Sequence, residues 1–147
     1  MTDAKAKLAQ HFAAAIPHAM ALGMRMDKIG TGAAELSMGY DERFIGDPAT
    51  GVIHGGAVFA LMDTCCGAAV ISHPGGGAGT ATIDLRMDYM RPATPGQRIR
   101  ARAECYHMTR AVAFVRATAM DDDEGRLVAT ATGTFTVERA DGKEAAE

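Results

Sequence analysis

The sequence predicts an α+β fold in which a curved antiparallel sheet of five to six strands wraps around one long hydrophobic helix, with a short N-terminal helix. Residues 51–72, GVIHGGAVFALMDTCCGAAVIS, are apolar, rich in alanine, and far too long for a strand. The flanking segments contain short runs with period-two alternation, which is typical of strands with one buried face. We therefore expect the apolar helix to fill the sheet.

Before the apolar segment, the chain indicates a helix and then a hairpin. Apolar residues recur every four positions over residues 4–16, which predicts an amphipathic helix, and Pro17 prevents its continuation. The runs MRMDKI and AAELSM flank a glycine-rich turn and indicate two paired strands. The polar loop YDERFIGDPATG follows, and the apolar helix is expected to begin near His54.

After the apolar segment, the glycine loop HPGGGAG leads into strand-like runs. Apolar and charged residues alternate in ATIDLRMDYM and in RIRARAEC, which predicts a sheet with one dry and one charged face. If these two strands are antiparallel neighbours, their charges are largely complementary. VAFVRATAM and RLVATATGTFTV predict a terminal hairpin. We expect one domain over residues 1–147, with a polar tail from about residue 140.

Composition and charge argue against several classes of function. The formal net charge of -3 and the scattered basic residues give no electrostatic basis for nucleic-acid binding. Cys65, Cys66 and Cys105 lack the spacing of a metal site or disulfide framework, so we expect buried thiols in a reducing compartment. The N-terminal segment does not resemble a secretory signal, and residues 57–71 are too short, with an acid at their centre, for a membrane span. We expect a soluble, cytoplasmic protein.

The start of the apolar helix is a candidate binding site. If the helix begins near His54, the amides of Gly55, Gly56 and Ala57 have no intrahelical acceptor and lie at the positive end of the helix dipole. Such amides can polarise a carbonyl oxygen, and glycine lets a ligand approach the backbone. A tight turn or a close packing contact would explain the same two glycines.

Asp63 is the single carboxylate of this apolar segment. Burial of an unpaired carboxylate costs several kcal/mol, and its neighbours on the helix offer no partner. The acid therefore meets a polar group of another element or faces a cavity, where it would be a candidate base or nucleophile. His54 cannot pair with it on one straight helix, because nine residues turn the helix by about 180° and advance it by about 13 Å. If both act in one site, a second copy of the chain must contribute, which predicts a symmetric dimer.

The string GDPATGVIHGGAVFALMDTCCGAA, followed by ATIDLRMDYMRPATPG, resembles the hotdog-fold acyl-CoA thioesterases of the PaaI-like, phenylacetate-pathway type. The specific motifs are G-x-x-H-G-G, an aspartate nine residues after the histidine, and Y-x-R-P-A, and the resemblance covers nearly the whole chain. It implies a hotdog fold, homodimers with composite sites at the interface, and a dimer of dimers as the homotetramer. It also implies hydrolysis of a short-chain, medium-chain or aromatic acyl-CoA to free acid and CoA, without a metal or organic cofactor.

The resemblance also assigns roles to individual residues. Asp63 is the catalytic carboxylate, as nucleophile on the thioester or as base for water. The Gly55 amide of the other subunit polarises the thioester carbonyl, and His54 and Gly56 lie beside it. Thr82 matches a position where the family often has Ser or Thr that orients water or the carboxylate, although the strand alternation places it on the polar face.

Two further positions concern substrate binding. Asp47 stands where the family commonly has asparagine, and an ionised carboxylate cannot donate a hydrogen bond, which puts the positioning of water in doubt. Arg91 and Arg110 are candidates for contacts with CoA phosphates, although each taken singly is more readily explained as a solvated surface arginine.

Two alternative functions differ from hydrolysis. A protein that binds acyl-CoA or another apolar ligand without turnover could use the same groove, but it would have little reason to keep an unpaired Asp63 there. A hydratase acting on an enoyl-CoA would need an Asp and a His within reach in one subunit. The half-turn between His54 and Asp63 argues against the hydratase.

Overall fold

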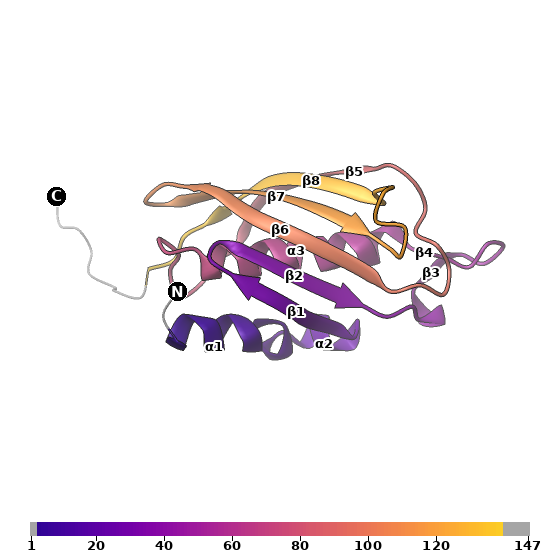
Figure 1. Cartoon of the computed structure of the whole chain (residues 1–147), viewed down its shortest axis with the longest axis horizontal. Coiled ribbons are helices and arrows are strands. Elements are labelled where there is room, and N and C mark those ends of the chain that lie inside the picture. The colour runs from indigo at the N-terminus through magenta and orange to yellow at the C-terminus, as the bar shows by residue number, and fades with distance from the viewer. Residues whose placement is uncertain (1–2, 140–147) are drawn as a thin grey trace.

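The computed structural model describes residues 3–139, which form a curved antiparallel sheet around one central helix (Figure 1). The sheet strands are β1 (Met24–Gly30), β2 (Ala33–Met38), β5 (Thr82–Tyr89), β6 (Ile99–Met108), β7 (Val112–Met120) and β8 (Ala129–Thr136). The helices are α1 (Asp3–Phe12), α2 (Pro17–Ala21) and α3 (Gly55–Ser72), with short turns η1 (Ala13–Ala15) and η2 (Glu42–Phe44). A two-stranded ribbon, β3 (Ile45–Asp47) and β4 (Val52–Ile53), precedes α3. The predicted α+β arrangement is confirmed.

Helix α3 forms the core because small or apolar side chains occur on nearly every side of it. Leu61, Met62, Cys65 and Cys66 are fully buried. Strands β2, β6 and β7 pack against the helix along much of its length. The end of α1 also packs on it, since a Cβ at Gly67 would lie 3.3 Å from the Phe12 ring. The helix therefore fills the sheet, as predicted.

Small side chains on the inner face let the sheet approach α3 closely. One row of directly paired residues runs from β2 to β5 and consists of Leu36, Ala101, Ala119, Ala129 and Tyr89. The first four are fully buried, and the row ends at Tyr89 on the edge strand β5. The register of the sheet therefore places Tyr89 on the face that covers the helix.

The hypothesis that the runs at residues 81–90 and 98–105 form neighbouring strands is wrong. The strand order is β1-β2-β6-β7-β8-β5, so β5 pairs with β8 and β6 lies between β2 and β7. The connection after β5 is attached to the turn between β7 and β8 by an ion pair between Arg91 and Asp121. This connection crosses the end of the sheet instead of forming a hairpin. Alternation within each strand carries no information about this order.

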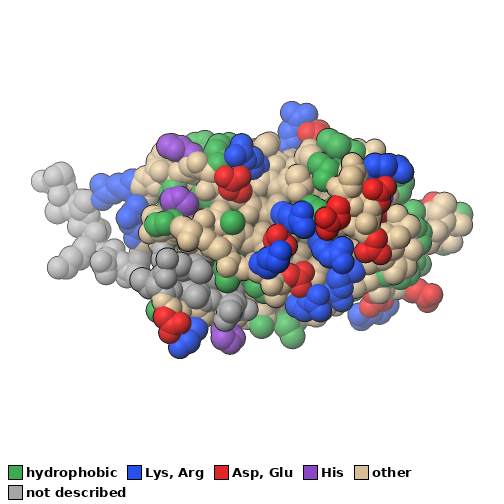
Figure 2. Space-filling view, in the orientation of Figure 1, with side chains coloured by type: hydrophobic (Ala, Val, Ile, Leu, Met, Phe, Trp, Pro, Cys, Tyr) green, Lys and Arg blue, Asp and Glu red, His purple; other side chains and the backbone are tan. Residues whose placement is uncertain are grey.

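The outer face of the sheet carries interleaved basic and acidic side chains, as Figure 2 shows. Arg102 on β6 lies 3.2 Å from Glu35 on β2, and Arg116 on β7 lies 3.1 Å from Glu104 on β6. Exposed pairs of this kind contribute about 0–1 kcal/mol each. The prediction of one charged and one apolar face is confirmed, with pairing partners that differ from those expected.

The N-terminal helix and the polar loop differ from their predictions. The helix expected over residues 4–16 ends at Phe12, and a new helix begins at Pro17. Proline is favoured at the first helical position because its missing N–H is not needed there. The polar loop contains β3, and β4 follows the loop directly; both strands are too short to show alternation. The predicted polar tail from about residue 140 lies outside the described residues.

Helix α3 has 18 residues and is longer than residues 57–71, the stretch that was expected to be too short for a membrane span. Among the described residues it is the one helix long and apolar enough to cross a membrane by length and composition. Of its 18 residues, 61% are buried within this fold. That burial is the behaviour of a core helix.

Candidate active site

The start of α3 is organised by His54, which is the N-cap residue. The Gly56 N–H donates to His54 Nδ1 at 2.8 Å, and the Ala57 N–H donates to the His54 carbonyl at 3.0 Å. Within residues 3–139, no group accepts a hydrogen bond from the Gly55 N–H. The cap therefore leaves one amide, that of Gly55, available to a ligand at the positive end of the helix dipole.

Gly56 belongs to the cap of the helix in the structure, and its predicted contact with substrate stays a prediction. Its N–H is already bonded to His54, and a Cβ at this position would lie 2.9 Å from His54 Nδ1. Glycine is required here because the imidazole ring occupies the space of a side chain. The structure therefore assigns Gly56 to the cap of the helix.

Asp63 lies two turns further along α3 and meets a polar group from another element. The carboxylate is half-buried and accepts a hydrogen bond of 2.6 Å from the hydroxyl of Thr82 at the start of β5. The sequence left two possibilities for Asp63, a polar partner on another element or a cavity. The structure shows the polar partner, and the carboxylate also lies at a partly open surface. Asp63 and Thr82, predicted from different parts of the sequence, are in direct contact.

A β-bulge explains how Thr82 reaches the helix. Thr82 pairs with Phe135 and Asp84 pairs with Thr134, so Ile83 is an extra residue on β5. A bulge shifts the alternation by one residue and re-aims the side chains before it. The prediction that Thr82 lies on the polar outer face is therefore wrong.

His54 and Asp63 are separated as the helix geometry predicts. No hydrogen bond or ion pair joins them among the residues that the structure describes. His54 lines a cavity of about 350 Å³ with His18, Arg43 and Gly56, and Gly55 lines a different cavity. Within one chain, His54 acts as a cap and is not paired with Asp63.

The cavity beside Gly55 is lined mostly by apolar side chains and measures about 440 Å³. Its walls include Val52, Ile53, Val58, Met90, Ala93 and Val128. Tyr89 also lines it, and the Tyr89 hydroxyl donates to the Gly55 carbonyl at 2.7 Å. Burial raises the pKa of the Tyr89 phenol, so the phenol keeps the proton that it donates. In the sequence, Tyr89 was visible as the last residue of an apolar strand face and as the first residue of the Y-x-R-P-A motif.

Asp47 holds its own loop. Its carboxylate accepts hydrogen bonds from the Ala49 N–H at 3.1 Å and from the Thr50 hydroxyl at 2.7 Å. Its carbonyl also accepts from the N–H of Gly51 at 2.8 Å. A carboxylate suits this turn because every bond of its side chain is one that it accepts. In the structure Asp47 stabilises its own loop, and its role in substrate binding stays a prediction.

Arg91 has no free donor for a CoA phosphate. Its guanidinium makes a bidentate pair with Asp121, with both distances 2.7 Å, and its other three N–H bonds point to the carbonyls of Pro92 and Arg126. All five donors of a guanidinium are thereby used. The predicted phosphate contact is not supported, and Arg91 instead fixes the segment after β5. Arg110 lies exposed in the turn between β6 and β7.

The three cysteines are free and buried, as predicted. Burial raises the pKa of Cys65 to about 12 and also raises the pKa of Cys66 and Cys105. Protonated thiols are poor nucleophiles. Although Cys66 lies one turn from Asp63, the side chain with nucleophilic or basic character in this part of α3 is the carboxylate.

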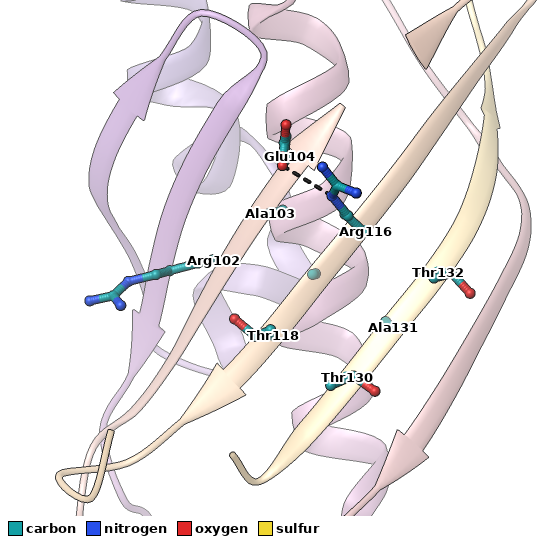
Figure 3. Close-up of a pocket in the computed structure, with 9 residues that line it drawn as sticks. Arg102, Ala103, Glu104, Arg116, Thr118, Thr130, Ala131 and Thr132 are labelled. Atoms are coloured by element: carbon teal, nitrogen blue, oxygen red, sulfur yellow. Dashed lines mark hydrogen bonds and ion pairs between the residues drawn. The ribbon is translucent and has the colours of Figure 1, made fainter. Parts of the chain in front are cut away.

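A further cavity of about 410 Å³ lies over β6, β7 and β8 on the outer face of the sheet (Figure 3). Thr118, Thr130 and Thr132 line it, together with Glu104 and Arg116, which pair with each other. The sheet separates this hollow from α3. The outer cavity is therefore not part of the Asp63 site.

Comparison with known proteins places these features in a family. Residues 50–128 match the Thioesterase superfamily. The medium/long-chain acyl-CoA thioesterase YigI of Escherichia coli strain K12 is 27% identical over 135 residues, which cover 83% of this chain and 86% of that protein. A crystal structure of a Pseudomonas aeruginosa protein is 36% identical with a TM-score of 0.81, over 91% of this chain and 99% of that chain.

A mutant structure of the phenylacetic acid degradation protein PaaI from Thermus thermophilus is also similar. It is 29% identical with a TM-score of 0.73, over 84% of this chain and 100% of that chain. The predicted resemblance to hotdog proteins of the PaaI type is thereby confirmed. The segment that matches the superfamily contains all of α3 and β5, and with them Gly55, Asp63 and Thr82.

Proposed function

Because the chain belongs to the thioesterase superfamily, we propose that it hydrolyses an acyl-CoA thioester to the free acid and CoA, with Asp63 and the Gly55 amide as its reacting groups. The name of the YigI relative supports the acyl-CoA class of substrate. The single observation that carries the site is the half-buried carboxylate of Asp63, held by Thr82 at 2.6 Å. The acyl group that we propose is short-chain, medium-chain or aromatic.

The chemistry follows from these two groups. Hydrolysis adds the oxygen of one water to the acyl carbon and breaks the C–S bond, and the sulfur leaves as the thiol of CoA. Asp63 takes the proton from the attacking water, or it attacks the carbonyl carbon itself and expels the CoA thiolate. In the second case water then hydrolyses the acyl anhydride on Asp63, which releases the free acid and restores the carboxylate. The Gly55 N–H donates to the carbonyl oxygen, where negative charge develops, and donors of this kind contribute about 3–4 kcal/mol. The helix dipole adds to this stabilisation.

One chain cannot supply both groups to one carbonyl. Gly55 and Asp63 are eight residues apart on one straight helix, which corresponds to about 12 Å along its axis. An oxyanion donor must lie within about 3 Å of the oxygen, and the attacking atom about 3–3.5 Å from the carbon. We therefore propose that the site is composite, with Gly55 from one subunit and Asp63 from its partner.

The edge strand β5 is the proposed dimer interface. It is the last strand of the sheet, so one side of its backbone is unpaired within the described chain. Exposed apolar side chains lie on or beside it, since Ile83 is 56% exposed, Met90 59% and Phe59 36%. Unprotected edges and apolar patches are features of interfaces. Phe59 lies on α3 between Gly55 and Asp63, so an interface there would bring a second α3 beside the first. Further pairing into a dimer of dimers is part of the proposal.

The test is thiol release from a panel of aliphatic and aromatic acyl-CoA esters. The variant Asp63→Asn keeps the shape of the side chain and is expected to lower thiol release by at least about a hundredfold, because general base catalysis contributes about 10²–10⁴. The matched control is Asp122→Asn, which makes the same change on an exposed turn. Undiminished release by Asp63→Asn would contradict the assignment. Tight binding of acyl-CoA without any release by the wild-type protein would indicate a binding protein instead.

A further inference from the structure

Tyr89 lies directly against Gly55, the residue whose amide the helix cap leaves available. Its ring covers Gly55, where a Cβ would lie 3.3 Å from two ring carbons. Its hydroxyl donates to the Gly55 carbonyl at 2.7 Å. Tyr89 therefore contacts the residue whose N–H is proposed to bind the thioester oxygen, and it does so from β5.

Both polar groups of the peptide unit between Gly55 and Gly56, its carbonyl and its N–H, form hydrogen bonds with side chains. Its oxygen accepts from the Tyr89 hydroxyl, and its N–H donates to His54 Nδ1 at 2.8 Å. Hydrogen bonds at the two ends of one peptide polarise and strengthen each other. Two adjacent glycines would otherwise give this turn the widest choice of backbone angles. Fixing the plane of this peptide limits the rotation of Gly55 and thereby the direction of its N–H.

Tyr89 is itself anchored on a rigid support. It pairs with Ala129 on β8, and the next residue, Met90, donates its N–H to the Val128 carbonyl at 2.8 Å. The ion pair of Arg91 with Asp121 then secures the following segment. The sheet thus fixes the position of the ring and hydroxyl independently of the helix.

We infer that Tyr89 is a positioning residue, which orients the Gly55 N–H towards the thioester oxygen through its bond to the Gly55 carbonyl. This inference rests on the proposed hydrolysis of an acyl-CoA. The phenol contributes to the rate through Gly55 and does not itself react. Oxyanion donors act over a narrow range of distance and angle, so a small rotation of the amide lowers the turnover rate more than it lowers substrate binding.

The variant Tyr89→Phe removes the hydroxyl and keeps the ring over Gly55. Loss of one hydrogen bond of this strength is expected to reduce kcat by about threefold to tenfold, while KM changes by less than about twofold. The matched control is Tyr40→Phe, because the Tyr40 hydroxyl also donates at 2.7 Å to a glycine carbonyl, that of Gly51. Both variants lose the same kind of bond, so their melting temperatures are expected to fall alike, and only Tyr89→Phe lowers kcat.

A spectroscopic measurement separates positioning from stability. A ketone analogue of an acyl-CoA, in which CH₂ replaces the sulfur and the carbonyl carries ¹³C, is bound to each protein and its carbonyl stretch is recorded. A well-placed donor lowers this frequency, so we expect it to rise in Tyr89→Phe and to match the wild type in Tyr40→Phe. A wild-type kcat and stretch in Tyr89→Phe would overturn the inference. If the wild-type protein hydrolyses no acyl-CoA ester, the proposed function fails and the inference fails with it.

Discussion

Asp63 is held by a hydroxyl and not by a cation. None of the ion pairs formed within residues 3–139 includes it. The contact with Thr82 orients one carboxylate oxygen at 2.6 Å and leaves the remaining lone pairs free. A salt bridge would orient the group as well, but it would also neutralise the charge that makes a carboxylate basic. This arrangement suits a group that must approach a substrate carbon or a water molecule.

The contact predicts the effect of changing Thr82. Thr82→Val replaces the hydroxyl by a methyl group of similar size, so Asp63 loses its orienting donor. We expect kcat to fall by about tenfold to a hundredfold, because a hydrogen bond to a charged group contributes about 1.5–3 kcal/mol. Thr82→Ser keeps the hydroxyl and is expected to retain most of the activity. Thr132→Val, on the outer face of β8, is the control, and equal rates for the two valine variants would argue against a role for Thr82.

The roles of residues that differ from their neighbours in the sequence were easier to predict than the roles of residues that do not. Asp63 stands alone among apolar residues, so its isolation was visible. Asp121 is the first residue of the acidic run DDDEG, which has the composition of a solvated turn, yet it is fully buried. Tyr89 ends an apolar strand face, and its hydrogen bond to Gly55 depends on how β5 and α3 pack. Those two roles come from tertiary contacts that no local pattern reports.

At the scale of elements, the segment after β5 is held in place by the ion pair between Arg91 and Asp121. Asp121 accepts from Arg91 and also from the N–H and hydroxyl of Thr94, at 3.0 and 2.8 Å. The guanidinium of Arg91 holds the pKa of the Asp121 carboxyl well below its ordinary range. Because folding lowers this pKa, the pair contributes its full stability above the unfolded-state pKa of about 3.9. That contribution is lost as the pH falls towards the folded-state pKa.

The ion pair between Arg91 and Asp121 predicts that the free energy of unfolding depends on pH. Asp121→Asn leaves Arg91 without its buried partner and is expected to lower the free energy of unfolding at pH 7 by about 3 kcal/mol. The difference from the wild type should shrink below about pH 4, where the wild-type protein also begins to lose the pair. Urea unfolding at pH 7 and pH 3 measures both values. Asp123→Asn, an exposed neighbour, is the control, and a difference that does not change with pH would contradict the assignment.

The elements were predicted from length and periodicity, and their arrangement was not. The helix within residues 51–72 and the two hairpins follow from local patterns of apolar residues. The position of β5 beside β8, the bulge at Ile83 and the short strands β3 and β4 do not. Strand order depends on which edges pack around α3, and one extra residue reverses the faces of a strand. The error in the orientation of Thr82 followed directly from the bulge.

For the whole molecule, the composite site makes a quantitative prediction. Chains with Asp63→Asn and chains with Gly55→Leu are each expected to be inactive as pure dimers, since Leu at position 55 would also meet the Tyr89 ring. After mixing in equal amounts, half of the dimers are hybrids, and each hybrid has one intact site of two. We expect about a quarter of the wild-type thiol release. No recovery in mixtures shown to contain hybrid dimers would contradict sharing of the site between subunits.

A thioesterase produces one free thiol in every turnover, so it works in contact with a compound that exchanges readily with disulfides. Cys65 and Cys66 lie in the same helix as Asp63, yet both are completely inaccessible. Burial raises the pKa of Cys65 to about 12, so its thiol stays protonated at pH 7. The fold can therefore keep sulfur atoms beside its candidate site without forming mixed disulfides with CoA. In this respect the packing of α3 gives the protein chemical inertness as well as stability.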